Sequence, residues 1–67
     1  MDKLKINSKK LNILQAEKGL DNNKFAKLLG IGIGTLLYIK NGSRSPRVQT
    51  IGKIAEALQI PVTDLII

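Results

Sequence analysis

The stretch that decides the fold runs from residue 20 to residue 42 and reads LDNNKFAKLLGIGIGTLLYIKNG. Asp21 is a favourable helix N-cap, and the apolar spacing behind it predicts a helix over about 22–29. Gly30 ends that helix, and a turn of a few residues leads into a second helix over about 33–40. Two short helices joined by a tight turn that contains glycine cross at a wide angle, so the second helix projects from the surface.

The sequence on either side predicts three further helices. Asn7 with the serine behind it is an N-cap for a helix over about 9–18. The apolar residues of the region 48–58 repeat with a helical period, which predicts a helix whose stripe, Val48 included, lies in the core. After the proline at position 61, a last short helical turn is expected over 63–67.

The length of the chain allows one domain with one small core, because it has only 67 residues. We expect residues 1–8 to form an N-terminal arm or a short strand. Residues 9–67 are expected to form one all-α domain of five short helices. The chain contains no cysteine, so helix packing or a second copy of the chain, and not disulfides, is expected to stabilise this core.

Composition disfavours several classes of protein. With no histidine, no cysteine and five carboxylates, the chain lacks the usual nucleophile–base pairs and metal ligands, so we expect no enzyme, no metal and no cofactor. Gly30–Gly34 lacks the preceding strand and glycine spacing of a dinucleotide loop. A chain of this length leaves no room for a ligand domain, so no small-molecule ligand is expected. The weakly polar run 28–39 is shorter than the roughly 20 residues of a membrane helix, and no targeting signal is evident. We expect a soluble, cytoplasmic protein that does not bind membranes.

Charge is the strongest signal in the composition, with eleven basic and five acidic residues and a net charge of +6. Residues 1–47 carry ten of the basic and three of the acidic residues, whereas residues 48–67 carry one basic and two acidic residues. This asymmetry fits a surface for a polyanion, and it equally fits a charged surface that keeps the protein in solution. Phe25 and Tyr38 are the only aromatic residues, which disfavours single-stranded nucleic acid, since its binders stack bases on several rings.

An ordered series of residues connects these features. Its members are Leu11, Leu14, Lys18-Gly19, the run 20–31, Thr35-Leu36, Ile39, Asn41-Gly42, Arg44, Pro46, Thr50-Ile51, Ile54-Ala55, Leu58 and Ile60-Pro61. In type and spacing the series resembles the Cro/repressor-type helix-turn-helix family of phages and bacteria, over about residues 9–66. The resemblance implies a lambda-repressor-like domain that binds double-stranded DNA. It implies that the protein is a repressor that acts by occupying an operator, and that it binds the DNA as a homodimer.

The resemblance also implies which residues contact DNA. The helix from residue 22 lies across the phosphate backbone, and the helix from residue 33 enters the major groove, with Leu36 and Ile39 facing the core. The implied base contacts are Ile33, Gly34, Leu37 and Tyr38. The implied phosphate contacts are Asn22, Lys24, Lys27, Thr35, Asn41, Ser43, Arg44, Ser45 and Arg47. The last of these is also placed to approach a minor groove.

The chain departs from the family pattern most clearly in the helix that would read DNA. Its outward positions lack the amide, basic and acidic side chains that pair with base edges, and Ile33 and Leu37 can contact only thymine methyl groups. We hypothesise an A/T-rich site that is recognised through methyl contacts, backbone contacts and DNA shape. The alternative is that this helix has lost base recognition and buries its apolar face against a protein partner.

Two further departures concern structure. Gly32 replaces the usual Ser or Thr cap, and Gly34 lies within the helix, where it costs about 0.5–1 kcal/mol relative to alanine. Gln15 and Lys40 occupy positions where the family often pairs Arg with Glu, so that no unpaired buried charge remains. We expect Lys40 to point outward and to add to the cationic face.

The C-terminal end is apolar and predicts a contact with a second copy of the chain. The interface is expected to comprise Leu65, Ile66 and Ile67, which would place two reading helices about 34 Å apart on adjacent half-sites. Two other classes of protein remain open. One is a protein-interaction module of the same fold, such as an antirepressor or an antitoxin-like partner. The other is a basic membrane-active peptide, which the regular core pattern disfavours.

Overall fold

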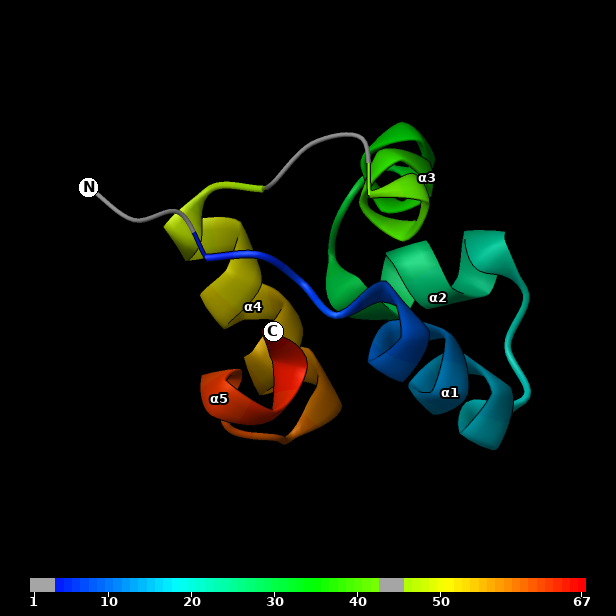
Figure 1. Ribbon diagram of the computed structural model, residues 1–67. Helices are drawn as coiled ribbons and strands as arrows, with labels where there is room; N and C mark the ends of the chain where they lie inside the picture. The colour runs from blue at the N-terminus through cyan, green and yellow to red at the C-terminus, as the bar shows by residue number, and fades with distance from the viewer. Residues whose placement is uncertain (1–3, 43–45) are drawn as a thin grey trace.

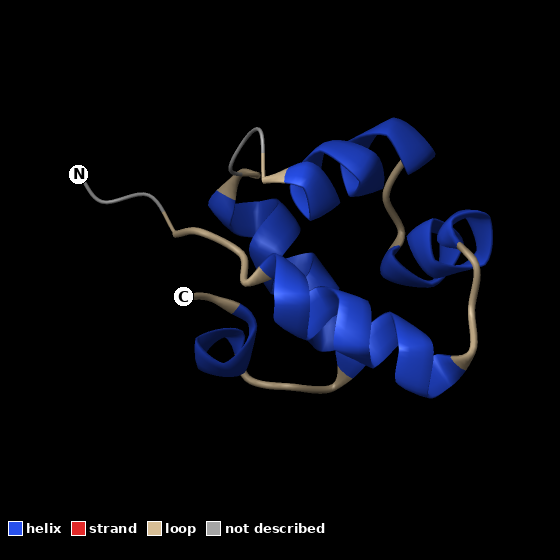
Figure 2. Ribbon diagram, turned by 45° about the vertical axis from the view of Figure 1, so that its right-hand side comes forward, coloured by secondary structure: helices blue, strands red, loops and turns tan. Residues whose placement is uncertain are grey.

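The structure is a computed structural model that describes residues 4–42 and 46–67. It contains five helices in this part of the chain, and Figures 1 and 2 show how they are arranged. They are α1 (Ser8–Lys18), α2 (Asn22–Leu29), α3 (Ile33–Asn41), α4 (Val48–Leu58) and α5 (Val62–Leu65). The prediction of an all-α domain with five short helices is confirmed, and the bounds of the first four agree with the expected ones to within one residue.

Local signals in the sequence set the ends of the helices. The Asn7 side chain accepts a hydrogen bond from the Lys10 amide at 3.2 Å, and Asp21 accepts one from the Lys24 amide at 2.8 Å. Both predicted N-caps are therefore confirmed. Gly30 ends α2 with φ of 72°, a left-handed conformation that glycine adopts without steric cost.

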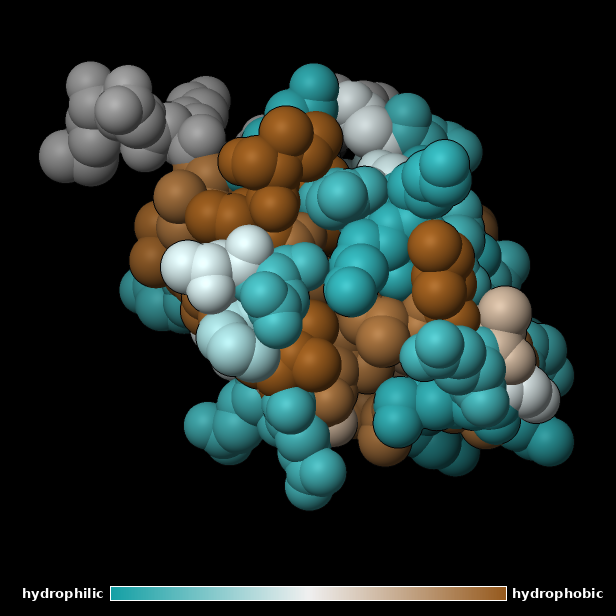
Figure 3. Space-filling model, turned by 60° about the horizontal axis from the view of Figure 1, so that its bottom comes forward, coloured by the Kyte–Doolittle hydropathy of each residue, from teal (hydrophilic) through white to brown (hydrophobic). Residues whose placement is uncertain are grey.

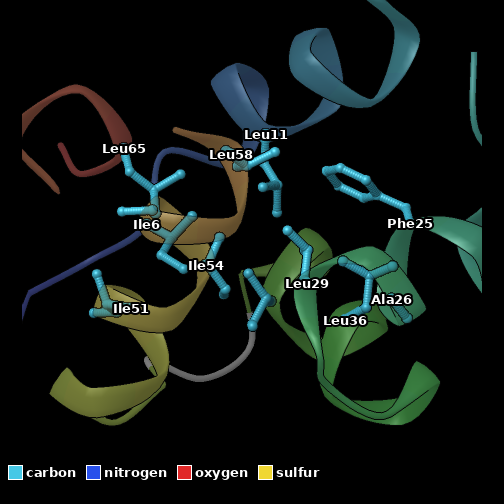
Figure 4. Packing of buried hydrophobic residues seen from close by; sticks show 12 residues of the cluster. Ile6, Leu11, Phe25, Ala26, Leu29, Leu36, Ile51, Ile54, Leu58 and Leu65 are labelled. Carbon is cyan, nitrogen blue, oxygen red and sulfur yellow. The ribbon is translucent and has the colours of Figure 1, made fainter. Parts of the chain in front are cut away.

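The core is formed where all five helices and the N-terminal segment meet. It consists of Ile6, Leu11, Phe25, Ala26, Leu29, Leu36, Ile39, Ile51, Ile54, Ala55, Leu58 and Leu65. Ile54 has no exposed surface, and Figure 4 shows it near Ile6 and Leu65. The α4 stripe is therefore core, as predicted, with one exception. Val48, the first residue of α4, is 66% exposed, so its predicted burial is wrong.

The N-terminal segment pairs with the C-terminal end. Ile6 and Ile66 form an isolated antiparallel bridge, in which the Asn7 amide donates to the Leu65 carbonyl and the Ile67 amide donates to the Lys5 carbonyl, both at 2.9 Å. Ile6 is also buried. The packed unit therefore extends N-terminal to residue 9. Within residues 4–42 and 46–67, no helix has the length and the apolar character needed to cross a membrane.

Candidate nucleic-acid interface

The unit of α2, its turn and α3 lies at the side of the molecule opposite α5 in both ribbon views (Figures 1 and 2). After Gly30, the Ile31 amide donates to the Ala26 carbonyl at 3.0 Å, so the chain reverses tightly at the end of α2. Buried residues hold both helices against the core, namely Phe25, Ala26 and Leu29 from α2 and Leu36 and Ile39 from α3. The opposite face of α3 is consequently left at the surface.

The exposed face of α3 is apolar. Ile33 is 40% exposed and Leu37, four residues later, is 43% exposed, and Gly34 is exposed as well. An alanine methyl group at Gly34 would meet no atom within 4 Å. Tyr38 differs from these three residues, since it is half-buried and packs against the core. The expected outward position of Tyr38 is therefore only partly met, while Ile33, Gly34 and Leu37 lie on the surface.

The N-terminus of α3 has no side-chain cap. Gly32 occupies the N-cap position and supplies no side chain that could accept a hydrogen bond, as its residue type predicts. Its carbonyl accepts from the Leu36 amide at 3.0 Å, so the helix begins with backbone bonds alone. Thr35, in the first turn, is half-buried.

Several residues predicted to contact phosphates lie in α2, at the end of α3 or at the start of α4. Lys24 and Lys27 are exposed on α2, and Asn41 is exposed at the end of α3. Arg47 is exposed at the start of α4, where its side chain makes no capping hydrogen bond. The other predicted contacts of this group, Ser43, Arg44 and Ser45, lie outside the described residues.

A polar network at the last turn of α3 joins three helices. The Lys40 ammonium of α3 donates to Gln15 Oε1 of α1 at 2.7 Å and to Asn22 Oδ1 of α2 at 2.8 Å. Gln15 Nε2 in turn donates to Asn22 Oδ1 and to the Leu20 carbonyl, both at 3.0 Å. The expectation that Lys40 points outward is wrong, because two side-chain oxygens from other helices accept its hydrogen bonds.

This network also involves Asn22, which was predicted to contact a phosphate. Its Oδ1 accepts two hydrogen bonds within the protein, so an anion could interact only with its amide nitrogens. Sequence reasoning missed the roles of Gln15 and Lys40. The signal that could have found them is the joint change of both positions, since an amide and an ammonium can pair where a guanidinium and a carboxylate often do.

The predicted dimer residues are placed differently from one another. Leu65 has no exposed surface and belongs to the core of its own chain, because it faces Ile6 and Ile54 (Figure 4). The expectation that Leu65 contributes to an interface between copies is therefore wrong. Ile66 is half-buried, and Ile67 is 80% exposed. Figure 3 shows apolar atoms at the surface of the face on which α5 lies.

The chain is similar to known proteins over most of its length. A profile described as "Helix-turn-helix" matches residues 11–65. The cryptic phage CTXphi transcriptional repressor RstR of Vibrio cholerae is 30% identical to the chain over 59 residues, which cover 88% of this chain and 53% of RstR. The chain thus spans about half the length of this relative. No solved structure gave a significant match. Because the profile covers most of the chain, including α2, the turn and α3, the protein belongs to the Cro/repressor-type helix-turn-helix family of DNA-binding domains, whose members are typically not enzymes.

Proposed function

We propose that the protein is a sequence-specific regulator of transcription that binds double-stranded DNA and represses by occupying an operator. The observation that carries the proposal is the position of α3, whose outer face is exposed within a family match over residues 11–65. A helix has the right width for the major groove of a duplex. The similarity to a phage repressor supports the direction of regulation.

The distribution of charge supports a duplex as the partner. Lys24 and Lys27 precede α3 in the sequence and Arg47 follows it. All three side chains are exposed and can neutralise phosphates of a DNA backbone. The net charge of +6 favours association with a polyanion. In this proposal these side chains set orientation and affinity, and the face of α3 supplies the sequence preference.

We infer a homodimer on DNA, with its contact at the exposed C-terminal end. Ile67 is the most exposed large apolar residue of the described chain, and its neighbour Ile66 is half-buried. A two-fold pair would present two copies of α3 to adjacent half-sites about 34 Å apart. Ile67→Asp is expected to abolish cooperative occupancy of a two-half-site duplex while binding to one half-site persists.

The experiment that tests the function is selection of bound duplexes from a random pool, followed by a salt titration on the selected sequence. If six to ten phosphates are contacted, affinity should fall by about 10³–10⁵ between 50 and 200 mM salt. Arg47→Ala should lower the log–log salt slope by about 1 and weaken all sequences alike. Lys18→Ala is the matched control, because Lys18 is also exposed but lies in the last turn of α1, outside the proposed DNA and dimer contacts. An unenriched pool, or an affinity that does not depend on salt, would exclude this function.

A second candidate is a protein-interaction module of the same fold. The observation that favours it is the apolar face of α3, where Ile33 and Leu37 are exposed and could pack into the groove of a partner protein. Such a complex would show little dependence on salt, whereas binding to a duplex depends on it steeply. The salt titration therefore separates the two candidates.

A further inference from the structure

We propose that α3 reads the 5-methyl groups of thymines, so that the preferred DNA is a run of A·T pairs with thymines at defined positions. The proposal rests on the proposed function and adds the chemistry by which the target is recognised. It is argued from three features of the described structure, which are the composition of the exposed α3 face, the hydrogen bonds of the lysine within α3 and the exposed cations of α2 and of the start of α4.

Over the first two turns of α3, the exposed residues lack polar side-chain atoms, whereas Thr35 and Tyr38, which carry hydroxyl groups, are half-buried. Ile33 and Leu37 are 40% and 43% exposed and lie one turn apart on the same side of the helix, and Gly34 adds no side chain. In the major groove, guanine, cytosine and adenine present hydrogen-bonding groups, whereas thymine also presents a methyl group. The thymine methyl is therefore the base-edge group that this face can contact without leaving a polar atom unpaired.

The ammonium group of Lys40, the lysine within α3, is engaged within the protein. Lys40 could read guanine if it reached the groove, since Lys pairs with the O6 and N7 atoms of that base. Its Nζ instead donates to Gln15 Oε1 at 2.7 Å and to Asn22 Oδ1 at 2.8 Å. Lys40 follows Leu37 by three residues, and its ammonium could read guanine only by giving up these bonds.

Geometry limits the positions of the contacted thymines. Ile33 and Leu37 lie about 6 Å apart along the helix axis, because four residues rise about 1.5 Å each. Base pairs rise about 3.4 Å per step along one strand. The two side chains can therefore contact methyl groups that are one or two base steps apart.

The exposed cations Lys24, Lys27 and Arg47 favour a polyanion as the occupant of this apolar face over an uncharged groove.

The test replaces single thymines of a selected duplex with deoxyuridine, which removes one methyl group and keeps every hydrogen-bonding atom. At each thymine that the protein contacts, replacement with deoxyuridine should weaken binding about four-fold, the value expected for one buried methyl group. Replacing the same thymine with cytosine should weaken binding as well, and 5-methylcytosine should restore part of the loss, because it returns the methyl group at the same edge. Deoxyuridine at positions outside the preferred run should have no effect.

Protein variants connect the methyl effect to the two side chains. In Leu37→Ala, deoxyuridine at the thymine that Leu37 contacts should no longer weaken binding, and Ile33→Ala should remove the effect at a different thymine. Both side chains are on the surface, and the melting temperature of each variant verifies that it folds. Ile13→Ala is the matched control, because Ile13 is 46% exposed on α1 and its removal should leave the deoxyuridine effects unchanged.

The possible outcomes separate this inference from the proposed function. Tight, salt-dependent binding to a selected duplex without any deoxyuridine effect overturns the methyl inference and leaves the proposed function standing. If no duplex binds under any condition, both are overturned. If Ile33→Ala and Leu37→Ala abolish binding to a protein partner but not to DNA, the face is a protein interface and the methyl inference is wrong.

Discussion

Replacing Lys40 with methionine tests the network that joins α1, α2 and α3. The ammonium of Lys40 donates to Gln15 Oε1 at 2.7 Å and to Asn22 Oδ1 at 2.8 Å. Methionine has a similar length and helix propensity, so the change removes the charge and the donors while the helix is kept. After the substitution Asn22 Oδ1 still accepts from Gln15 Nε2 at 3.0 Å, whereas the hydrogen bond to Gln15 Oε1 is lost.

The magnitude follows from the number of bonds and from their exposure. A hydrogen bond to a charged group contributes roughly 1.5–3 kcal/mol where it is well shielded. Lys40, Gln15 and Asn22 are all half-buried, so water replaces part of what is lost, and we expect a total loss of about 1–2 kcal/mol. In a domain of this size, each kcal/mol lowers the melting temperature by about 4–8 °C. Lys40→Met should therefore lower it by about 5–15 °C.

Thermal and urea unfolding followed by circular dichroism measure this change. The control is Lys9→Met, which removes the same charge from an exposed position on α1. A double variant with Gln15→Leu should lose less stability than the sum of the two single variants, because the partners depend on each other. Equal melting temperatures for Lys40→Met and Lys9→Met would refute the reasoning.

Three other substitutions test the backbone and the helix ends, each by urea unfolding. Gly34→Ala should raise the free energy of unfolding by about 0.5–1 kcal/mol, since the methyl group meets no atom within 4 Å; unchanged DNA affinity would show that the helix needs no closer approach to DNA at this residue. Gln59→Gly should stabilise by up to about 1 kcal/mol, because Gln59 ends α4 with φ of 58°, and a loss of stability would contradict this explanation. Asp21→Ala should cost about 1 kcal/mol through loss of the cap to the Lys24 amide, whereas Asp21→Asn should retain most of it.

The sequence was sufficient to predict features that depend on neighbouring residues. The N-caps at Asn7 and Asp21 and the end of α2 at Gly30 were predicted correctly, because each depends on one side chain and the few amides beside it. The α4 core residues were also correct, since a helical period identifies a buried face.

Features that depend on long-range contacts were not predictable in the same way. Lys40 and Gln15 are 25 residues apart, and their hydrogen bond exists only because α1 and α3 pack together. Leu65 is buried because the N-terminal segment with Ile6 pairs with the chain end, a contact between residues with no shared local pattern. Val48 belongs to the apolar period of α4 but is 66% exposed, since the period alone does not tell how far along the helix the tertiary packing extends. Which residues contact DNA stays a prediction for the same reason, since it depends on how a partner docks.

The most direct test of the central claim, that α2 and α3 form the surface that docks on duplex DNA, is an amide chemical-shift titration of the protein with a selected duplex at modest ionic strength. The account predicts that the largest shifts occur at Lys24, Thr35 and Leu37, while the amide of Thr63 in α5 changes little on a single half-site. Unchanged amides in α2 and α3 with every duplex, or shifts confined to α5, would contradict it.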